Sequence, residues 1–290
     1  MVMVFEETPQ QFYLHKWLKS NFDIAIKVVK KDWDMVFVID GTEGGGKSVL
    51  AQQVAKYCDP TLTIDRIVFT PHQFKDAVMK AEKYQAIVYD EAYAGLGSRG
   101  TMSHVNIMLV KMLTEIRQKN LFIFIVLPTF FDLDKYVALW RSRALIHVYA
   151  TGKFERGQFA FYNKQQKKLL YIEGKKLYSY KKPRPAFIGR FTNHYTVDKK
   201  EYLEKKRNST VCEEDEIRTA TLRISRELRE KIAVALQRNI PGLTQTQIGL
   251  VMGVARETVN RYLKKEGIEQ LDEQIRLEPR EMSVSDKVIK

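Results

Sequence analysis

A short apolar run, a glycine-rich loop and a helical pattern follow one another over residues 36–58, and this order constrains the fold more than any other part of the chain. Residues 36–39 are all apolar, which is typical of a buried parallel strand. Residues 41–48 read G-T-E-G-G-G-K-S and fit the pattern G-x-x-x-x-G-K-[ST]. Apolar residues then recur at helical spacing: Val49, Leu50, Val54 and Ala55. A strand, this loop and a helix in sequence predict a phosphate-binding loop in an α/β fold.

Phosphate chemistry explains the residue types of this loop. Glycines let backbone N–H groups approach phosphate oxygens closely, and the N-terminus of the following helix adds its positive dipole end. Lys47 is placed to reach the β- and γ-phosphates, and the Ser48 hydroxyl to ligate Mg²⁺. A glycine-rich turn that binds nothing is disfavoured, because strand, motif and helix are all in order. The predicted nucleotide-binding residues are Gly41, Thr42, Glu43, Gly44, Gly45, Gly46, Lys47 and Ser48.

Two carboxylates follow a second apolar run at residues 86–89. Asp90 is placed to hold Mg²⁺ through its water shell, so that Ser48 and Asp90 form the predicted metal site. Glu91 is placed to polarise the attacking water as a general base. An acidic turn is common for an isolated Asp-Glu pair, but it is the minority interpretation after a complete phosphate-binding loop. The predicted cofactors are therefore ATP and Mg²⁺.

A further strand and helix, over residues 67–83, separate the loop from the Asp-Glu pair. This spacing resembles the additional-strand, catalytic-glutamate branch of the P-loop NTPases. Further apolar runs at residues 121–127 and 145–149 predict two more strands. The expected fold is α/β, with a central, mostly parallel sheet.

Later motifs carry a narrower resemblance. The chain has D-E-A at residues 90–92, E-I-R-Q-K-N at 115–120, a strand ending in Pro-Thr, L-D-K-Y at 133–136 and R-S-R at 141–143. This order resembles the HerA/FtsK-type DNA-pumping ATPases, and most of all their viral genome-packaging and zonula-occludens-toxin-like members. The resemblance covers about residues 20–150.

The resemblance implies two further catalytic residues and an assembly. Arg117 occupies the place of an arginine finger that reaches the γ-phosphate of a neighbouring subunit, which implies a homo-oligomeric ring, a hexamer or pentamer. A surface ion pair with Glu115 is the alternative role for Arg117. Thr129 stands where such ATPases carry a polar γ-phosphate sensor, which is Gln in many members. A viral portal or a mobile-element protein is an expected partner.

Positive charge is concentrated in one part of the chain. The net charge is +13, and residues 153–207 hold 16 Lys and Arg against 5 Asp and Glu, a net of +11. This excess predicts a polyanion partner, DNA, although a soluble basic surface is the alternative. The run was expected to form a β-meander of hairpins, whose lysines either contact DNA or guard a solvated strand edge. The predicted DNA-binding lysines are Lys164, Lys167, Lys168, Lys175 and Lys176.

Residues 243–267 resemble a helix-turn-helix of the bacterial-regulator type. Thr244 is a natural N-cap, and Gly253 falls in the turn before a second helix at residues 255–265. A helical hairpin used for protein contact is the alternative. The residues expected to bury one face are Ile248, Val251, Val254, Val259 and Leu263. Those expected to face outward and contact DNA are Arg256, Asn260 and Arg261.

Four segments are expected: a P-loop ATPase domain at 1–150, a basic β-hairpin extension and linker at 151–212, a small all-α helix-turn-helix domain at 213–270, and a charged tail at 271–290. No apolar run approaches the roughly 20 residues of a membrane helix, so no membrane partner is expected. Two cysteines without metal or redox spacing favour a reducing cytoplasm, the host's if the protein is viral.

These features predict an ATP-hydrolysing DNA motor that packages or translocates a viral or mobile-element genome. One alternative is an ATP-dependent DNA-binding regulator or transposition helper ATPase. Another is a nucleotide kinase, which the Asp90-Glu91 pair and the lack of an arginine-bearing lid signature disfavour.

Overall fold

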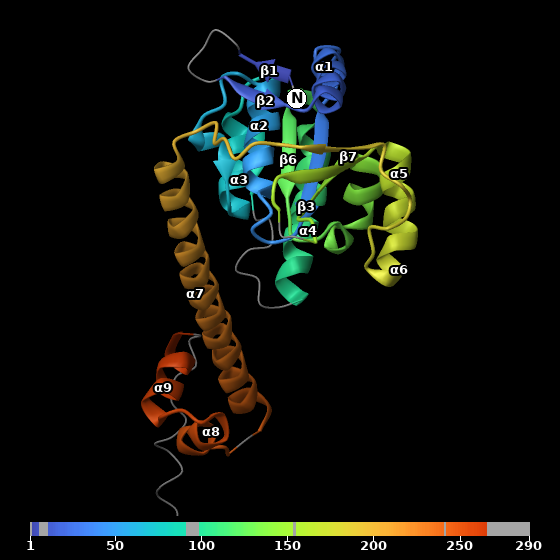
Figure 1. Ribbon diagram of the computed structural model, residues 1–290. Coiled ribbons are helices and arrows are strands. Elements are labelled where there is room, and N and C mark those ends of the chain that lie inside the picture. Colours follow the sequence, from blue (N-terminus) through green and yellow to red (C-terminus); the bar gives the residue numbers. More distant parts are fainter. Residues whose placement is uncertain (1, 6–10, 91–98, 153–154, 241, 266–290) are drawn as a thin grey trace, which may run out of the picture. The chain divides into compact units, whose positions relative to one another are not determined.

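A computed structural model describes residues 2–5, 11–90, 99–152, 155–240 and 242–265. Internal contacts divide the chain into two compact units, unit 1 (Met1–Glu214) and unit 2 (Asp215–Lys290). The N-terminal residues, the sheet and most of the helices belong to unit 1 (Figure 1). Within the described residues, no helix is both long enough and apolar enough to cross a membrane.

Unit 1 is built on a seven-stranded sheet in the order β4-β5-β6-β3-β7-β8-β9. The first five strands of this order pair in parallel, and β8 and β9 add antiparallel strands at one edge. A separate antiparallel pair, β1 and β2, lies outside this sheet. The strands are β1 (Val2–Val4), β2 (Phe12–Leu14), β3 (Met35–Gly41), β4 (Ile67–Val68), β5 (Ala86–Tyr89), β6 (Phe122–Val126), β7 (Ser142–Tyr149), β8 (Gln158–Tyr162) and β9 (Phe187–Arg190).

The central strand β3 is apolar over residues 35–39 because both of its faces are covered. Side chains alternate across a strand, so Phe37 and Ile39 join the core on one face, while Val36 and Val38 join the core on the other. Strand β6 lies between β3 and β5, in parallel register with both. The carboxyl ends of these three strands therefore meet at one edge of the sheet.

Helices pack on both faces of the sheet (Figure 1). Residues of α1 and α2 fill one core, and residues of α3, α4 and the short turns of unit 1 fill the other. The helices of unit 1 before α7 are α1 (Lys16–Val29), α2 (Lys47–Cys58), α3 (Pro71–Lys80), α4 (Arg99–Glu115), α5 (Lys164–Leu169) and α6 (Lys175–Leu177). Short turns are η1 (Ile64–Arg66), η2 (Ile116–Lys119), η3 (Phe130–Asp132) and the π-helical η4 (Val137–Arg141) and η5 (Leu170–Gly174).

The β-meander predicted after β8 is wrong. Asn163 accepts hydrogen bonds from the backbone N–H groups of Gln165 and Gln166, and this capping box starts helix α5 where a turn was expected. The chain continues through η5 into α6 and returns to the sheet only at β9. The predicted domain boundary at residue 150 falls between β7 and β8, which are neighbours in one sheet.

Helix α7 (Lys199–Asn239) begins in unit 1 and continues into unit 2. There α8 (Gln245–Met252) and α9 (Arg256–Lys265) follow it. Thr244 caps α8 with a capping box, and Gly253 adopts a left-handed conformation between the two helices. The core of unit 2 is formed by Ala233, Ile248, Val259, Tyr262 and Leu263, with Val254 packed against it. Val251, expected in this core, is 72% exposed.

Candidate nucleotide-binding site

The glycine-rich loop joins β3 to α2 with backbone angles that suit glycine. Gly41 has a φ of 130°, and a Cβ there would lie 1.8 Å from the carbonyl oxygen of Val148 on the neighbouring strand. Gly46 has a φ of 99° and is the N-cap of α2. The sequence therefore needs glycine at both ends of the loop. The N-terminus of α2 follows directly, which makes the loop an anion-binding site.

Lys47 folds back over the loop. Its Nζ donates to the carbonyl oxygens of Gly41 at 2.8 Å and Thr42 at 3.1 Å. The side chain is partly exposed and lines a cavity. A phosphate is a stronger partner for an ammonium group than a peptide carbonyl, because both groups carry charge. The lysine is thus placed to exchange backbone oxygens for phosphate oxygens.

Ser48 and Asp90 meet at the edge of the sheet, as their positions after β3 and β5 predict. The Ser48 hydroxyl donates to Oδ1 of Asp90 at 3.1 Å. Asp90 is fully buried, and its Oδ2 accepts a 2.6 Å hydrogen bond from the Tyr202 hydroxyl at the start of α7. A hydroxyl and a carboxylate oxygen are the hard ligands that Mg²⁺ prefers.

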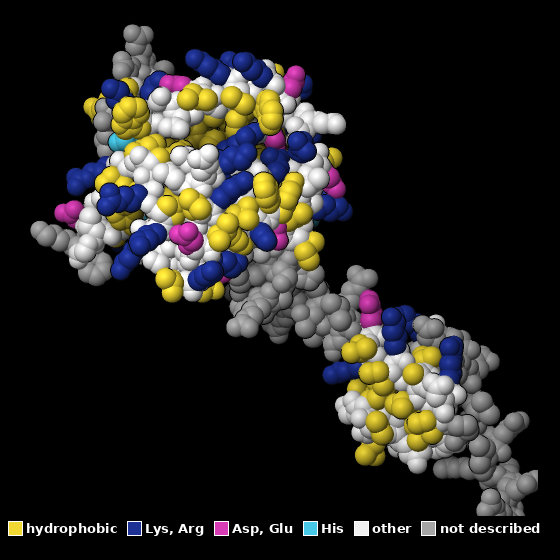
Figure 2. Space-filling view, turned by 90° about the vertical axis from the view of Figure 1, so that its right-hand side faces the viewer, with side chains coloured by type: hydrophobic (Ala, Val, Ile, Leu, Met, Phe, Trp, Pro, Cys, Tyr) yellow, Lys and Arg dark blue, Asp and Glu magenta, His cyan; other side chains and the backbone are white. Residues whose placement is uncertain are grey.

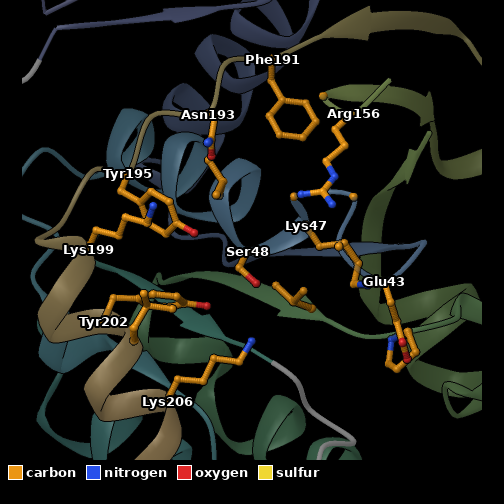
Figure 3. A pocket seen from close by; sticks show the side chains of 18 of the residues that line it. Glu43, Lys47, Ser48, Arg156, Phe191, Asn193, Tyr195, Lys199, Tyr202 and Lys206 are labelled. Atoms are coloured by element: carbon orange, nitrogen blue, oxygen red, sulfur yellow. The ribbon is translucent and has the colours of Figure 1, made fainter. Parts of the chain in front are cut away.

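A cavity of about 840 Å³ opens above the loop. The loop forms one wall, and the segment between β9 and α7 forms another (Figure 3). Its charged lining consists of Glu43 and four basic side chains: Lys47, Arg156, Lys199 and Lys206. Phe191, Asn193, Tyr195 and Tyr202 add aromatic and amide groups. The excess of positive charge suits a polyphosphate, and the aromatic groups suit a base or sugar.

The residues present fit Mg²⁺ and a nucleoside triphosphate. The loop would bind the phosphates, Lys47 would neutralise their charge, and Ser48 with Asp90 would hold the metal. All of these side chains could be identified from the sequence. The part of the cavity wall formed by residues 191–206 could not, because no local motif shows that this segment returns to the loop.

A buried network beneath the loop was also missed by sequence analysis. Asp40 is fully buried at the end of β3, where its two oxygens receive the backbone N–H of Phe130 at 2.8 Å, the Tyr180 hydroxyl, and the His147 Nδ1 contact at 2.9 Å. The rings of His147 and Tyr180 stack with centroids 3.7 Å apart. Burial, followed by the charge of Asp40, raises the pKa of Tyr180. In the sequence, only the position of Asp40 directly before the loop indicates this network.

Thr129 belongs to this network. Its hydroxyl lies 3.3 Å from the Tyr180 hydroxyl and accepts a 3.4 Å hydrogen bond from the backbone N–H of Phe131. Its neighbour Pro128 lines the cavity. The role of Thr129 as a γ-phosphate sensor stays a prediction.

The other two predicted catalytic residues are Arg117 and Glu91. Arg117 is exposed on η2, outside the set that lines the cavity, which leaves both of its predicted roles open to test. Glu91 lies outside the residues that the structure describes.

One of the predicted DNA-binding lysines is wrong. Lys167 is fully buried in α5, and its Nζ donates to the carbonyl oxygens of Ala138 and, at 3.2 Å, Leu139. Burial, together with the nearby charges of Lys168 and Lys164, lowers the pKa of Lys167 to about 7. A side chain enclosed in this way cannot reach a DNA phosphate.

The other lysines of α5 and α6 lie at or near the surface. Lys164 and Lys176 are exposed, the Nζ of Lys168 lies 3.8 Å from the ring centroid of Trp140, and Lys175 donates to the Tyr171 hydroxyl at 3.0 Å. Figure 2 shows the side of unit 1 that carries α5 and α6, with Lys and Arg in dark blue among hydrophobic side chains in yellow. Their contact with DNA stays a prediction.

In unit 2, Arg256 and Arg261 are exposed on α9 and Asn260 is partly exposed, whereas Val259 and Leu263 on the same helix are buried. Two helices joined by a tight turn at Gly253 agree with the expected geometry. That α9 reads DNA stays a prediction.

The sheet, the loop and the Ser48–Asp90 pair are consistent with a P-loop NTPase-like fold. No family model and no curated protein matches this chain. Among solved structures, the chain is similar to the N-terminal domain of zonular occludens toxin from Neisseria meningitidis, with 18% sequence identity and a TM-score of 0.35. That match covers 59% of this chain and 97% of the other. Similarity at this level supports no conclusion about activity or partners.

Proposed function

We propose that this chain is a Mg²⁺-dependent ATPase of the additional-strand, catalytic-glutamate type that moves DNA. The observation that carries the proposal is the 3.1 Å contact between Ser48 and Asp90 beside the glycine-rich loop. Ser48 begins α2 after β3 and Asp90 follows β5, and together they supply the hydroxyl and the carboxylate that a P-loop metal site needs. The insertion of β6 between β3 and β5 supports the additional-strand type.

Each residue has a distinct role in the proposed reaction. The loop backbone and Lys47 bind and orient the phosphates, and Glu91 takes a proton from the attacking water. Ser48 and Asp90 hold Mg²⁺, which when bound neutralises charge on the transferring phosphoryl group. Phe191 and Tyr195 line the cavity beside the loop, where aromatic rings suit contact with a base or sugar.

The DNA part of the proposal is supported by charge and by unit 2. Residues 153–207 carry a net charge of +11, counted from 16 basic and 5 acidic residues, and α9 presents Arg256 and Arg261 to solvent. Backbone phosphates are the partner that such a distribution suits. Packaging or translocation of a viral or mobile-element genome, in a host cytoplasm, is the setting we propose.

Hydrolysis measured with and without duplex DNA tests the proposal. We expect the wild-type chain to hydrolyse ATP with Mg²⁺ and to do so faster with DNA. Movement along single DNA molecules then separates a motor from a regulator whose ATPase controls assembly. A chain that transfers phosphate to a nucleoside monophosphate instead would be a kinase, and the proposal would be wrong.

The ring is tested through Arg117, which is exposed and thus free of a structural role in the core. If Arg117 acts on a neighbouring site, Arg117→Ala subunits will be inactive alone and will regain activity when mixed with Lys47→Ala subunits. In the mixture, an intact arginine meets an intact loop at some interfaces. Activity that mixing leaves unchanged, at protein concentrations where rings form, would favour a surface role for Arg117.

A further inference from the structure

The segment that leads into α7 is fastened to α2, the helix that follows the glycine-rich loop. Gln53 Nε2 donates to the carbonyl oxygens of Thr192 at 2.7 Å and His194 at 2.9 Å. Farther along, the Thr196 hydroxyl donates to the carbonyl oxygen of Gln52 at 3.3 Å. Both glutamines are fully buried and the residues that they contact are half-buried, so these bonds are partly shielded from water. The segment is therefore part of the nucleotide site rather than a loose linker.

The first turns of α7 are held at three further points. Tyr202, which is 2% exposed, donates its hydroxyl to the metal-site carboxylate of Asp90. One turn later, Lys205 Nζ donates to the carbonyl oxygens of Ile64 and Ile67 at 2.8 Å each. Ser209 then accepts a 3.1 Å hydrogen bond from Gln73. Lys205 and Ser209 attach to backbone and to a neutral amide, while Tyr202 attaches to a group that takes part in metal binding.

We infer that Tyr202 is a positioning residue that couples the metal site to α7. This inference rests on the proposed function, because it takes Ser48 and Asp90 as the Mg²⁺ site. Asp90 has two oxygens with separate partners, Oδ1 with Ser48 and Oδ2 with Tyr202. Tyr202 fixes the orientation in which Oδ1 faces the hydroxyl that binds the metal. A hydrogen bond to a charged group is stronger than one between two neutral groups.

The coupling acts in both directions, as linkage requires. A bound metal holds the Asp90 carboxylate in one orientation. The hydrogen bond from Tyr202 then forms at a smaller cost in conformational entropy, so the first turns of α7 open less often. In turn, α7 in place favours metal binding. The contacts at Tyr202, Lys205 and Ser209 all lie in the part of α7 that belongs to unit 1, so the state of the metal site reaches these first turns of the helix.

Hydrogen exchange in the full chain tests this coupling. The amides of residues 203–209 are followed in wild type and in Tyr202→Phe, with and without Mg²⁺ and a non-hydrolysable ATP analogue. We expect the ligand to slow the exchange of these amides about tenfold in wild type. In Tyr202→Phe, which lacks one hydrogen bond, the ligand should leave their exchange unchanged. A tenfold change in exchange corresponds to about 1.4 kcal/mol. The variant should still bind the analogue, with a several-fold higher Mg²⁺ concentration at half-saturation.

Tyr57→Phe is the matched control. It removes the same kind of tyrosine–aspartate bond, between Tyr57 and Asp23, away from the cavity. It should keep the protection of residues 203–209. As a second variant, Asp90→Asn should speed exchange at residues 203–209 even without nucleotide, because a neutral amide is a weaker acceptor for Tyr202.

The outcomes separate this inference from the proposed function. If Tyr202→Phe binds the analogue and shows the wild-type protection, or if Asp90→Asn leaves the exchange of residues 203–209 unchanged, the coupling is wrong and the ATPase proposal stands. If wild type does not bind Mg²⁺ and the analogue at all, both are wrong.

Discussion

Lys47 and Lys167 make the same kind of contact in two different regions of unit 1. Each ammonium group donates to two backbone carbonyl oxygens. Lys47 donates to those of Gly41 and Thr42, and Lys167 to those of Ala138 and Leu139 in η4. Lys47 is partly exposed on the wall of a cavity, whereas Lys167 is fully buried with no solvent contact. The same kind of hydrogen bond is therefore accessible to a ligand in one region and enclosed by the fold in the other.

This comparison indicates that the role of each lysine depends on whether a ligand can reach its ammonium group, more than on the neighbouring sequence. Lys47 can give up its carbonyl partners to a phosphate, because the cavity admits one. Lys167 has no other partner to take, and its buried charge destabilises the protonated form. Loss of Lys47 should affect activity, and loss of Lys167 should affect stability.

The largest effect is expected for Lys47→Ala. Removing the ammonium leaves the β- and γ-phosphate charge without its partner in the loop, so ATP turnover should fall by about 100-fold or more. The thermal midpoint should change little, because the side chain is partly exposed. Steady-state hydrolysis and thermal unfolding of the same preparation measure both. Turnover near the wild-type rate would contradict the role of the loop.

The reverse result is expected for Lys167→Met. The carbonyl oxygens of Ala138 and Leu139 lose their donor in a buried site, so the free energy of unfolding should fall by about 2 kcal/mol. Nucleotide affinity should be unchanged. Urea denaturation measures the loss, with the exposed Lys164→Met on the same helix as control. Equal stability of the two variants would mean that the buried contacts of Lys167 do not stabilise the fold.

The lowered pKa of Lys167 predicts that its contribution to the free energy of unfolding depends on pH. The pKa of Lys167 is about 7 in the folded chain, whereas the ordinary pKa of a lysine is 10.5, so between these two pH values the unfolded chain binds more protons. Stability from this group therefore rises with pH in that window, by up to about 1.4 kcal/mol per unit. The difference in unfolding free energy between wild type and Lys167→Met should grow by up to about 2 kcal/mol from pH 7 to 8.5. A difference independent of pH would place the pKa of Lys167 near its ordinary value.

The smallest effects are expected at the exposed lysines Lys164 and Lys176. If they contact DNA phosphates, changing each to Gln should weaken DNA binding a few-fold and lower the slope of log K against log salt by about one. Stability should stay the same. A salt titration of DNA binding measures the slope. An unchanged slope would mean that these lysines only cover a solvated surface.

The sheet could be predicted from the sequence, because β3, β5, β6 and β7 are apolar runs long enough to stand out. Their order places Ser48 beside Asp90, so the centre of the candidate site was predictable as well. In these strands, local pattern and tertiary packing favour the same structure.

Residues 164–180 could not be predicted in the same way. Tyrosines and apolar residues alternate there with lysines, which favours strands, but the capping box at Asn163 and the π-helical η5 override that pattern. Burial of Lys167 depends on η4, 28–29 residues earlier in the chain. No local pattern shows such a contact.

Long-range partners explain the other omissions. Tyr202 reaches Asp90 across 112 residues, and Tyr180 reaches Asp40 across 140. In unit 2, Thr244 and Gly253 mark the ends of α8 by local chemistry, so its position was predictable. The exposure of Val251 was not, since residues one turn apart on a short helix differ little in pattern.

The central claim is that Ser48 and Asp90 form the Mg²⁺ site of an ATPase. The most direct test is ATP binding and hydrolysis by Asp90→Asn over a range of Mg²⁺ concentrations, beside wild type. The account predicts that the variant binds ATP, loses most of its turnover and no longer gains affinity when Mg²⁺ is added. Hydrolysis at the wild-type rate, with the wild-type Mg²⁺ dependence, would contradict it.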